Sequence, residues 1–313
     1  MIQAAELAEV FKVKPQQINN LRTRYELSDD DSFVKSNGRR FYTPQGVRKI
    51  LEKRGYFFQR RNVSICNLKG GVGKTTIAVQ LARKTAEWGF KTLLVDCDKQ
   101  GNASDQLWVK ARDTDFPCLY DIIKNHVKVE SAFVKINDFL TLLPSNLKNQ
   151  LLEDEIKSAN INKGTFFRRL LGSFDFDVIV FDTEPNLSQV NLMALAYCDT
   201  NIAPVRLDKY SMDGLVLLLG FIEKQKKEWP EMMVQTKVLI NAYDKRMRTE
   251  SIRKIHEVSE LNLNAFNSTI RTDPTFARTQ YQGEIGPKTK AYEDITLFTA
   301  ELLRLDKAEQ AQS

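Results

Sequence analysis

The sequence predicts an α/β protein in which a doubly wound, mostly parallel sheet follows a small module of short helices and a hairpin. Three observations support this prediction. Apolar runs of strand type alternate with runs of helix type from residue 62 onward. A glycine-rich loop joins the first of these strands to the first helix. The excess positive charge is confined to the first fifth of the chain, which has its own apolar spacing.

The length and composition favour one large and one small domain in the cytoplasm. The chain has 313 residues, and 42% of them are hydrophobic. No run approaches the roughly 18 apolar residues of a membrane span, and the first residues lack the pattern of a signal peptide. We therefore expect no membrane partner. The four cysteines form no CxxC pair, so a zinc or iron–sulfur centre is not expected.

Positive charge is concentrated at the N-terminus. Residues 1–61 contain 13 Lys and Arg against 7 Asp and Glu, whereas the other residues contain 33 of each sign. A basic segment beside a neutral one is typical of a nucleic-acid-binding module attached to a second domain. A basic surface that only contacts solvent is the alternative. We place the two domains at residues 1–60 and 61–313.

The first domain is expected to begin with two helices. Leu7 and Phe11 lie on one face of a helix over residues 4–11, and a second helix runs from Pro15 to about Tyr25. Proline suits a first helical position because its missing N–H would be unpaired there in any case. The short gap between the helices predicts a helix-turn-helix.

A hairpin and a third helix are expected next. Two β-prone runs flank Asn37-Gly38, which is a typical sequence for a type I′ turn, and Thr43-Pro44 supplies an N-cap and a first helical residue. The order helix, helix, hairpin, helix resembles the winged helix-turn-helix of MerR-type regulators. In such a module the second helix enters the major groove. A small helical cap or a dimerisation domain would have the same apolar pattern.

If this module binds DNA, its polar and basic side chains make the contacts. Helix residues of this kind reach base edges, and arginines at the tip of the hairpin meet phosphates. The candidate DNA-binding residues are Gln16, Gln17, Asn20 and Arg22 on the second helix and Arg39 and Arg40 on the hairpin.

The glycine-rich loop predicts a nucleotide site. Residues 69–76 (KGGVGKTT) lie between a strand-type run and a helix-type run, so backbone N–H groups and a helix N-terminus face an anion. Lys74 is expected to reach the β- and γ-phosphates of ATP, and Thr75 to bind Mg²⁺. The other residues expected to contact the nucleotide here are Lys69, Gly70, Gly71, Val72, Gly73 and Thr76.

This loop departs from the ordinary phosphate-binding pattern because Leu68 stands where that pattern has glycine. The run KGGVGKTT resembles the deviant Walker A motif of the ParA/MinD family. The resemblance implies that Lys69 reaches across an ATP-sandwich homodimer to the nucleotide of the partner. The alternative is that Lys69 is a surface lysine beside an ordinary loop.

A second motif follows the next predicted strand, Thr92–Val95. This strand ends in Asp96 and Asp98, and carboxylates at that end of a strand lie beside the ligand crevice of a doubly wound sheet. The run resembles the family motif LLVDxDPQGN, with Lys99 in place of the usual proline. By this resemblance Asp98 orients the attacking water and Asp96 belongs to the Mg²⁺ shell.

A third motif has the form of a Walker B strand. Residues 176–181 (FDVIVF) are hydrophobic and end at Asp182, whose carboxylate is expected to help hold Mg²⁺. The family usually has a DxPP sequence at this point, so Glu184 is a second departure.

The resemblance to the ParA/MinD family covers residues 62–305. It implies that Asn241 contacts adenine and that a loop with Arg271 and Pro274 closes over the base. Several cations of this domain are candidates for a second, non-specific DNA-binding stripe across the dimer. They are Lys245, Arg246, Arg248, Arg271 and Arg278.

Together, the module and the ATPase motifs resemble the larger ParA partition proteins. The resemblance implies a nucleoid-associated, Mg²⁺-dependent ATPase that segregates DNA with a ParB-like adaptor and can regulate its own operon. Two alternatives stay open. One is a DNA-binding regulator that uses ATP only as a switch, and the other is an ATPase that positions a cargo other than DNA.

Overall fold

The computed structural model describes residues 1–108, 116–159, 161–244, 264–282, 285–286 and 289–305. The strands are β1 (Ile2–Gln3), β2 (Ser32–Val34), β3 (Arg40–Tyr42), β4 (Arg61–Ile65), β5 (Thr92–Asp96), β6 (Val134–Lys135), β7 (Leu140–Leu143), β8 (Val178–Asp182), β9 (Thr200–Val205) and β10 (Gln235–Ile240). The helices are α1 (Ala4–Val10), α2 (Pro15–Arg24), α3 (Pro44–Lys53), α4 (Lys74–Glu87), α5 (Asn102–Leu107), α6 (Leu119–Lys124), α7 (Leu152–Ser158), α8 (Phe166–Leu171), α9 (Gln189–Tyr197), α10 (Lys209–Glu228), α12 (Thr275–Gln282) and α13 (Lys290–Leu303).

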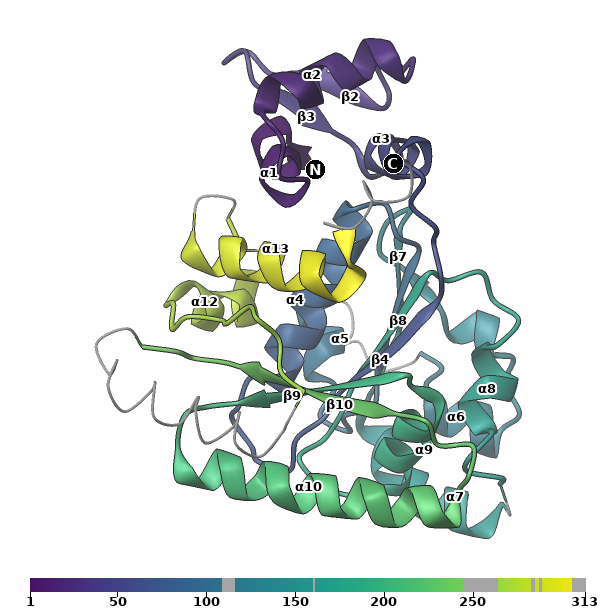
Figure 1. Cartoon of the computed structure of the whole chain (residues 1–313). Coiled ribbons are helices and arrows are strands. Elements are labelled where there is room, and N and C mark those ends of the chain that lie inside the picture. The colour runs from purple at the N-terminus through teal and green to yellow at the C-terminus, as the bar shows by residue number, and fades with distance from the viewer. Residues whose placement is uncertain (109–115, 160, 245–263, 283–284, 287–288, 306–313) are drawn as a thin grey trace.

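The large sheet has seven described strands in the order β10-β9-β4-β8-β5-β7-β6. Every neighbouring pair is parallel except β6 and β7, which are antiparallel. This confirms the predicted mostly parallel sheet (Figure 1). The strand β4 that precedes the glycine-rich loop lies in the interior of the sheet, between β8 and β9.

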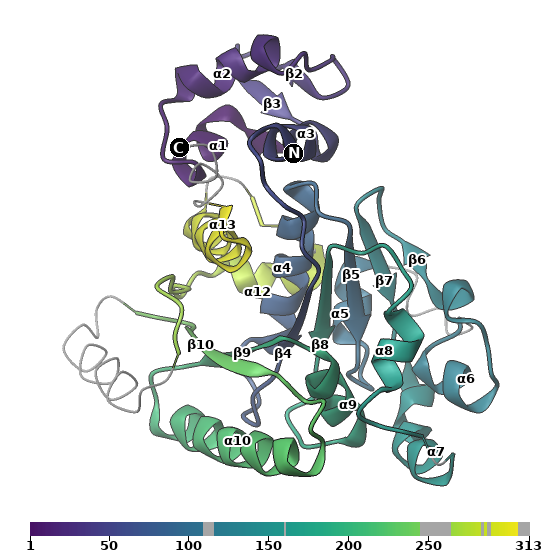
Figure 2. The ribbon, with the colours of Figure 1, turned by 45° about the vertical axis from the view of Figure 1, so that its right-hand side comes forward.

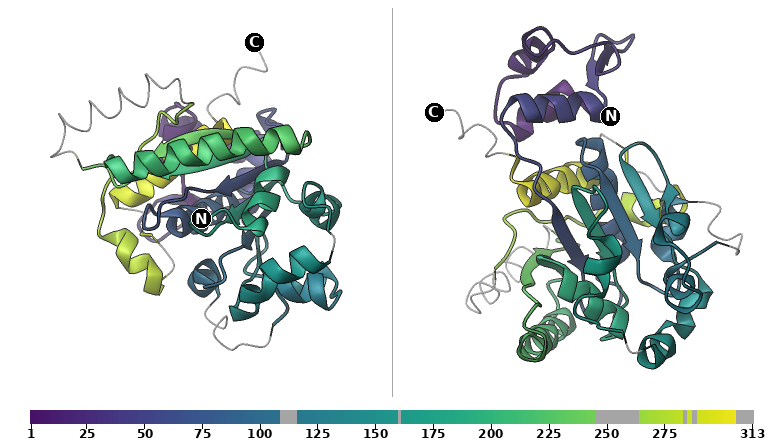
Figure 3. Two further views of the ribbon diagram at one scale, coloured as in Figure 1. Left: turned by 90° about the horizontal axis from the view of Figure 1, so that it is seen from below. Right: turned by 90° about the vertical axis from the view of Figure 1, so that its right-hand side faces the viewer.

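Alternating side chains of the buried strands form a hydrophobic core on each face of the sheet. In β8, Val178 and Val180 belong to one core, and Ile179 and Phe181 belong to the other. Helices α4 and α13 cover the first face, whereas α9 and parts of α10 cover the second (Figures 2 and 3). The sheet is therefore wound on both faces, as predicted.

The first 60 residues contain the expected helices, hairpin and third helix, with a short strand β1 that the apolar pattern did not reveal. The predicted type I′ turn is wrong. Gly38 has a φ of 76°, but Asn37 is not among the residues with positive φ. Instead the Asn37 side-chain oxygen accepts the N–H of Arg39 at 3.1 Å, and the Gly38 N–H donates to the carbonyl of Lys35 at 2.9 Å. The turn is thus closed by one left-handed glycine.

The N-terminal module packs directly on the large domain. Its buried side chains belong to the same hydrophobic core as those of α4 and α13, and the ring of Phe11 meets that of Trp88 edge to face. The buried Lys84 of α4 pairs with Glu6 of α1 at 3.3 Å, and Arg48 of α3 pairs with Asp177 at 2.6 Å. Residues before and after position 60 therefore share one core. The domain boundary at residue 60 stays a prediction.

Candidate nucleotide-binding site

The three predicted motifs meet at one edge of the sheet because their strands are neighbours. In the parallel register, Ile65 at the end of β4 lies opposite Asp182 of β8, and Asp182 lies opposite Asp96 of β5. The glycine-rich loop follows β4 and leads into α4. Parallel strands end at the same edge, so these segments lie together at the edge where doubly wound sheets bind their ligands.

The glycine-rich loop needs a glycine at the residue that precedes α4. Gly73 has a φ of 91°, and a Cβ atom there would lie 2.4 Å from Nδ2 of Asn241. The Lys74 ammonium donates to the carbonyl oxygen of Lys69 at 3.1 Å and is buried. Burial lowers the pKa of Lys74, while Cys66, Asp182 and Asp98 act in the opposite direction. A buried cation therefore lies under the loop.

Asp96 is held by Asp98 of its own motif and by Ser104, which the sequence motifs did not point to. Its Oδ2 accepts both the N–H and the hydroxyl of Ser104, at 2.8 and 2.7 Å, and its Oδ1 accepts the N–H of Asp98 at 3.1 Å. Burial raises the pKa of Asp96 to about 7. Ser104 lies on α5, so only the tertiary structure brings it to the site. The resulting hydrogen bonds fix the orientation of the Asp96 carboxylate.

Asp182 differs from Asp96 because its carboxylate is buried without a hydrogen-bond partner among the described residues. Burial raises its pKa well above the ordinary value, although the nearby Thr75 hydroxyl lowers it in part. Such an orphaned carboxylate beside a threonine hydroxyl fits a divalent cation, which favours oxygen ligands. No group of three or more His, Cys, Asp or Glu in the described segments can hold a metal alone. Mg²⁺ at this position would therefore take some of its oxygen ligands from phosphate, as Mg²⁺ commonly does.

Asp182→Asn is expected to stabilise the nucleotide-free protein at high pH. The folded-state pKa of Asp182 is raised, so the folded chain binds more protons than the unfolded chain above about pH 4. The contribution of Asp182 to the free energy of unfolding is fully present at lower pH, and it is lost as the pH rises through the folded-state pKa. Thermal unfolding without Mg²⁺ should show an increase in Tm of a few degrees, which grows as the pH rises above about 4.

The exposed Asp175 supplies the control, because Asp175→Asn removes a carboxylate that is already paired with Lys91. We expect no gain in Tm from that change. A lower Tm for Asp182→Asn than for the wild type at about pH 8 would contradict the assignment of Asp182 as an unfavourable buried carboxylate.

Asp98 begins the segment that leads from β5 to α5. Its Oδ1 accepts the N–H of Gln100 at 2.8 Å, and its Oδ2 is 3.4 Å from Nδ2 of Asn102. The side chain is half-buried. The Asp98 carboxylate therefore stays accessible to solvent while it also closes the turn that leads to Gln100.

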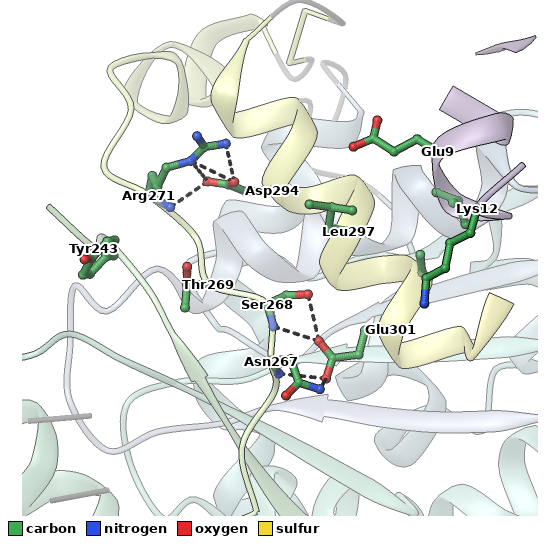
Figure 4. Close-up of a pocket in the computed structure, with 12 residues that line it drawn as sticks. Glu9, Lys12, Tyr243, Asn267, Ser268, Thr269, Arg271, Asp294, Leu297 and Glu301 are labelled. Carbon is green, nitrogen blue, oxygen red and sulfur yellow. Dashed lines mark hydrogen bonds and ion pairs between the residues drawn. The ribbon is translucent and has the colours of Figure 1, made fainter. Parts of the chain in front are cut away.

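The residues predicted to contact adenine lie in two segments, one directly after β10 and one beside it. The Asn241 amide donates to the Val72 carbonyl at 2.6 Å, which ties it to the loop. Arg271 instead forms ion pairs with Asp294 at 2.6 Å and Glu293 at 3.0 Å. Figure 4 shows its guanidinium turned toward Asp294. Both residues line a pocket of about 550 Å³ formed by α13, residues 267–271 and the end of α1. Adenine contact by Asn241, Arg271 and the exposed Pro274 stays a prediction.

The predicted DNA-binding stripe is only partly described. Arg278 is exposed, whereas Arg271 is neutralised by its carboxylate partners. Lys245, Arg246 and Arg248 lie outside the described residues.

The candidate DNA-binding residues of the N-terminal module have different surroundings. The exposed ones are Gln16, Gln17, Asn20 and Arg39, and the half-buried ones are Arg22 and Arg40. Gln17 accepts the N–H of Lys14 at 2.8 Å, so it caps α2 where Lys14 offers no side-chain acceptor. Arg22 pairs with Asp29, and Arg40 donates to the Ser32 hydroxyl at 3.3 Å. Their role toward DNA stays a prediction.

The parallel sheet, the glycine-rich loop and the two buried aspartates define a P-loop nucleotide-binding protein. Residues 60–235, more than half of the chain, match the model of an AAA domain family. The protein "Sporulation initiation inhibitor protein Soj" of Bacillus subtilis is 31% identical over 202 residues, which cover 63% of this chain and 78% of Soj. The chain therefore belongs to the ParA/MinD family of P-loop ATPases.

Solved structures show the same fold. A plasmid partition protein of Borrelia burgdorferi bound to AMPPNP has a TM-score of 0.66 at 21% identity, covering 80% of this chain and 100% of that one. A cobyrinic acid a,c-diamide synthase of Mycobacterium smegmatis, with an ATP analog and magnesium, has a TM-score of 0.65 at 24% identity, covering 78% and 94%. In addition, no helix among the described residues is long and apolar enough to cross a membrane.

Proposed function

We propose that this chain is a ParA-type partition ATPase that binds Mg²⁺ and ATP, closes as a homodimer, binds DNA and segregates it with a ParB-like adaptor. The observation that supports ATP chemistry most directly is the orphaned, buried carboxylate of Asp182 beside Asp96, Thr75 and the P-loop lysine. A plasmid partition protein bound to AMPPNP and a synthase bound to an ATP analog and magnesium share this fold, which supports the proposal.

Each residue of the candidate site has a separate role in ATP hydrolysis. Lys74 places a positive charge under the loop, where it meets the β- and γ-phosphates. Thr75 and Asp182 would hold Mg²⁺, and Asp96 would lie beside it. Mg²⁺, when bound, neutralises the charge that develops on the phosphates. Asp98 orients the water and accepts its proton.

Dimer formation is supported by a surface beside the loop. Lys69 is exposed, and its ammonium lies 5.5 Å from the ring centre of Tyr210 at the start of α10. Tyr210, Val216 and Leu217 of this helix are exposed apolar side chains. A second copy that covers this surface would bring its nucleotide within reach of Lys69. In the closed interface that lysine would contact the partner's γ-phosphate.

DNA contact is supported by the exposed polar face of α2 and by the basic N-terminal segment. Specific operator recognition belongs to this module because only groups in the major groove distinguish all base pairs. We assign non-specific DNA binding to the closed dimer. We place the protein on the nucleoid in the cytoplasm.

The proposal is tested by a salt titration of binding to random-sequence DNA, with ATP and with ADP. We expect ATP to increase the affinity of the wild type, because dimerisation joins two sets of cations on one DNA. Lys69→Ala should lose this increase together with ATP-dependent dimerisation, measured by light scattering. ATP binding by the monomer should remain. Equal DNA affinity with ATP and ADP at every salt concentration would contradict the partition proposal.

A double variant, Gln16→Ala with Asn20→Ala, serves as the matched control on the other DNA surface. It should keep ATP-dependent binding to random DNA and lose preference for the operator. Both variants are made in the full chain because deletion of residues 1–60 would uncover the core around Trp88.

The ATP-switched regulator is the second candidate, and one observation favours it. The N-terminal module packs on α4, the helix that follows the P-loop, through Glu6 and Phe11. A change at the nucleotide can therefore reach the module. Operator binding that responds to ATP, without ATP turnover or ATP-dependent binding to random DNA, would support this candidate.

A further inference from the structure

Two loops at the nucleotide site are joined by a contact between Lys99 and Glu184. Lys99 follows Asp98, and Glu184 lies two residues beyond Asp182. The N–H of Lys99 donates to Oε1 of Glu184 at 3.2 Å, and the Lys99 ammonium lies 3.5 Å from Oε2. The Glu184 carboxylate thus contacts both the backbone N–H and the side-chain ammonium of Lys99.

Glu184 is itself fixed from its own side. Its Oε2 accepts from Nδ2 of Asn186 at 2.6 Å, and its carbonyl oxygen accepts from Nδ2 of Asn191 at 3.0 Å. Asn191 is buried on α9, so Glu184 is anchored to a helix of the core. The Glu184 side chain is 11% exposed, whereas that of Lys99 is 43% exposed. The carboxylate is therefore the buried half of the pair.

Both residues stand where the family motifs have proline. Proline has no N–H and could not donate to Glu184, and proline at position 184 would offer no carboxylate. The two departures are thus chemically complementary. Each proline would stiffen its own turn, whereas the Lys99–Glu184 pair joins the two turns to each other.

We propose that Lys99 and Glu184 form a clamp that positions Asp98 against Asp182 for ATP hydrolysis. The clamp rests on the proposed ATPase function and adds two positioning residues to it. Neither residue touches phosphate in this role. Lys99 acts by holding the backbone next to Asp98, and Glu184 acts by holding that backbone to the segment after Asp182.

The clamp predicts an asymmetric response to proline. Lys99→Pro removes two donors from the buried Glu184 carboxylate, and we expect kcat to fall by roughly 10-fold. Glu184→Pro leaves Lys99 free to turn its ammonium to water, and we expect a fall of about 3-fold. The double variant restores a proline to both turns. Its kcat should be no lower than that of Glu184→Pro.

The measurements are steady-state ATP turnover and binding of a fluorescent ATP analogue. Binding should stay within about 2-fold of the wild type in all three variants, because the P-loop contacts are unchanged. Lys99→Arg keeps the N–H and the cation and should keep kcat. Lys124→Gln breaks a Lys–Glu pair of 2.9 Å on the outer surface and should also leave turnover unchanged.

Three results would overturn the clamp. The first is a double variant whose loss equals the product of the single losses, about 30-fold, since independent sites multiply. The second is wild-type kcat in Lys99→Pro. The third is loss of ATP binding in step with kcat, which would indicate general disruption.

Failure of the ATPase proposal is separable from failure of the clamp. If the wild type turns over no ATP, the same four proteins are compared by thermal unfolding without nucleotide. Changes in Tm that are smaller in the double variant than the sum of the single changes would support the Lys99–Glu184 coupling. Additive changes would overturn it.

Discussion

Lys74→Ala should lower the affinity for ATP by roughly 100-fold or more. The ammonium is buried under the P-loop, with the carbonyl of Lys69 as its hydrogen-bond acceptor. The contacts that we propose it makes with phosphate would be charge-assisted, and each contact of this kind contributes about 1.5–3 kcal/mol. Backbone N–H groups of the glycine loop remain in the variant, but they cannot replace a full charge. Equilibrium titration with a fluorescent ATP analogue measures the change.

Lys91→Ala is the matched control for Lys74→Ala. Lys91 precedes β5 at the opposite end of that strand and pairs with the exposed Asp175. We expect ATP affinity in this control to equal that of the wild type. Wild-type affinity in Lys74→Ala itself would show that the phosphates bind elsewhere.

Asp98→Asn should abolish turnover while ATP binding persists. Loss of a group that accepts a proton from water typically costs about 100- to 10,000-fold in rate. The amide keeps an oxygen that can accept the N–H of Gln100, now at 2.8 Å, so the turn is preserved. The variant should therefore bind ATP, dimerise and remain on DNA.

Asp98→Ala separates the chemical role of this residue from its structural one. It removes both the proposed proton acceptor and the acceptor that closes the turn at Gln100. If both variants lose kcat equally and keep ATP affinity, the chemical role accounts for the loss. If Asp98→Asn hydrolyses ATP normally and only Asp98→Ala fails, Asp98 is structural.

The motifs by themselves determined the central part of the fold and of the candidate site. An apolar strand, a glycine loop and a helix are local signals, because each depends on residues close together in the chain. Asp96 and Asp182 could be assigned to one site because parallel strands end at a common edge. The elements of the first 60 residues were likewise predictable from apolar spacing and turn residues.

Other features depended on contacts between distant residues. Residues 116–175 contain short elements, including β6, β7 and the helices α6 to α8, whose apolar runs have no distinctive period. Ser104 reaches Asp96 only after α5 folds back on β5. The docking of α1 on α4 also joins residues far apart in the chain, such as Glu6 and Lys84.

The Lys99–Glu184 pair shows the difference most clearly. The sequence identified both residues as departures from the family motifs, but it gave no reason to connect positions 85 residues apart. The pairing arises because β5 and β8 are neighbours in register, so the loops that follow them emerge side by side. Local sequence thus determined which residues could act at this edge of the sheet. Only the tertiary structure decided which of them hold one another in place, because strand order is set by packing across the whole core.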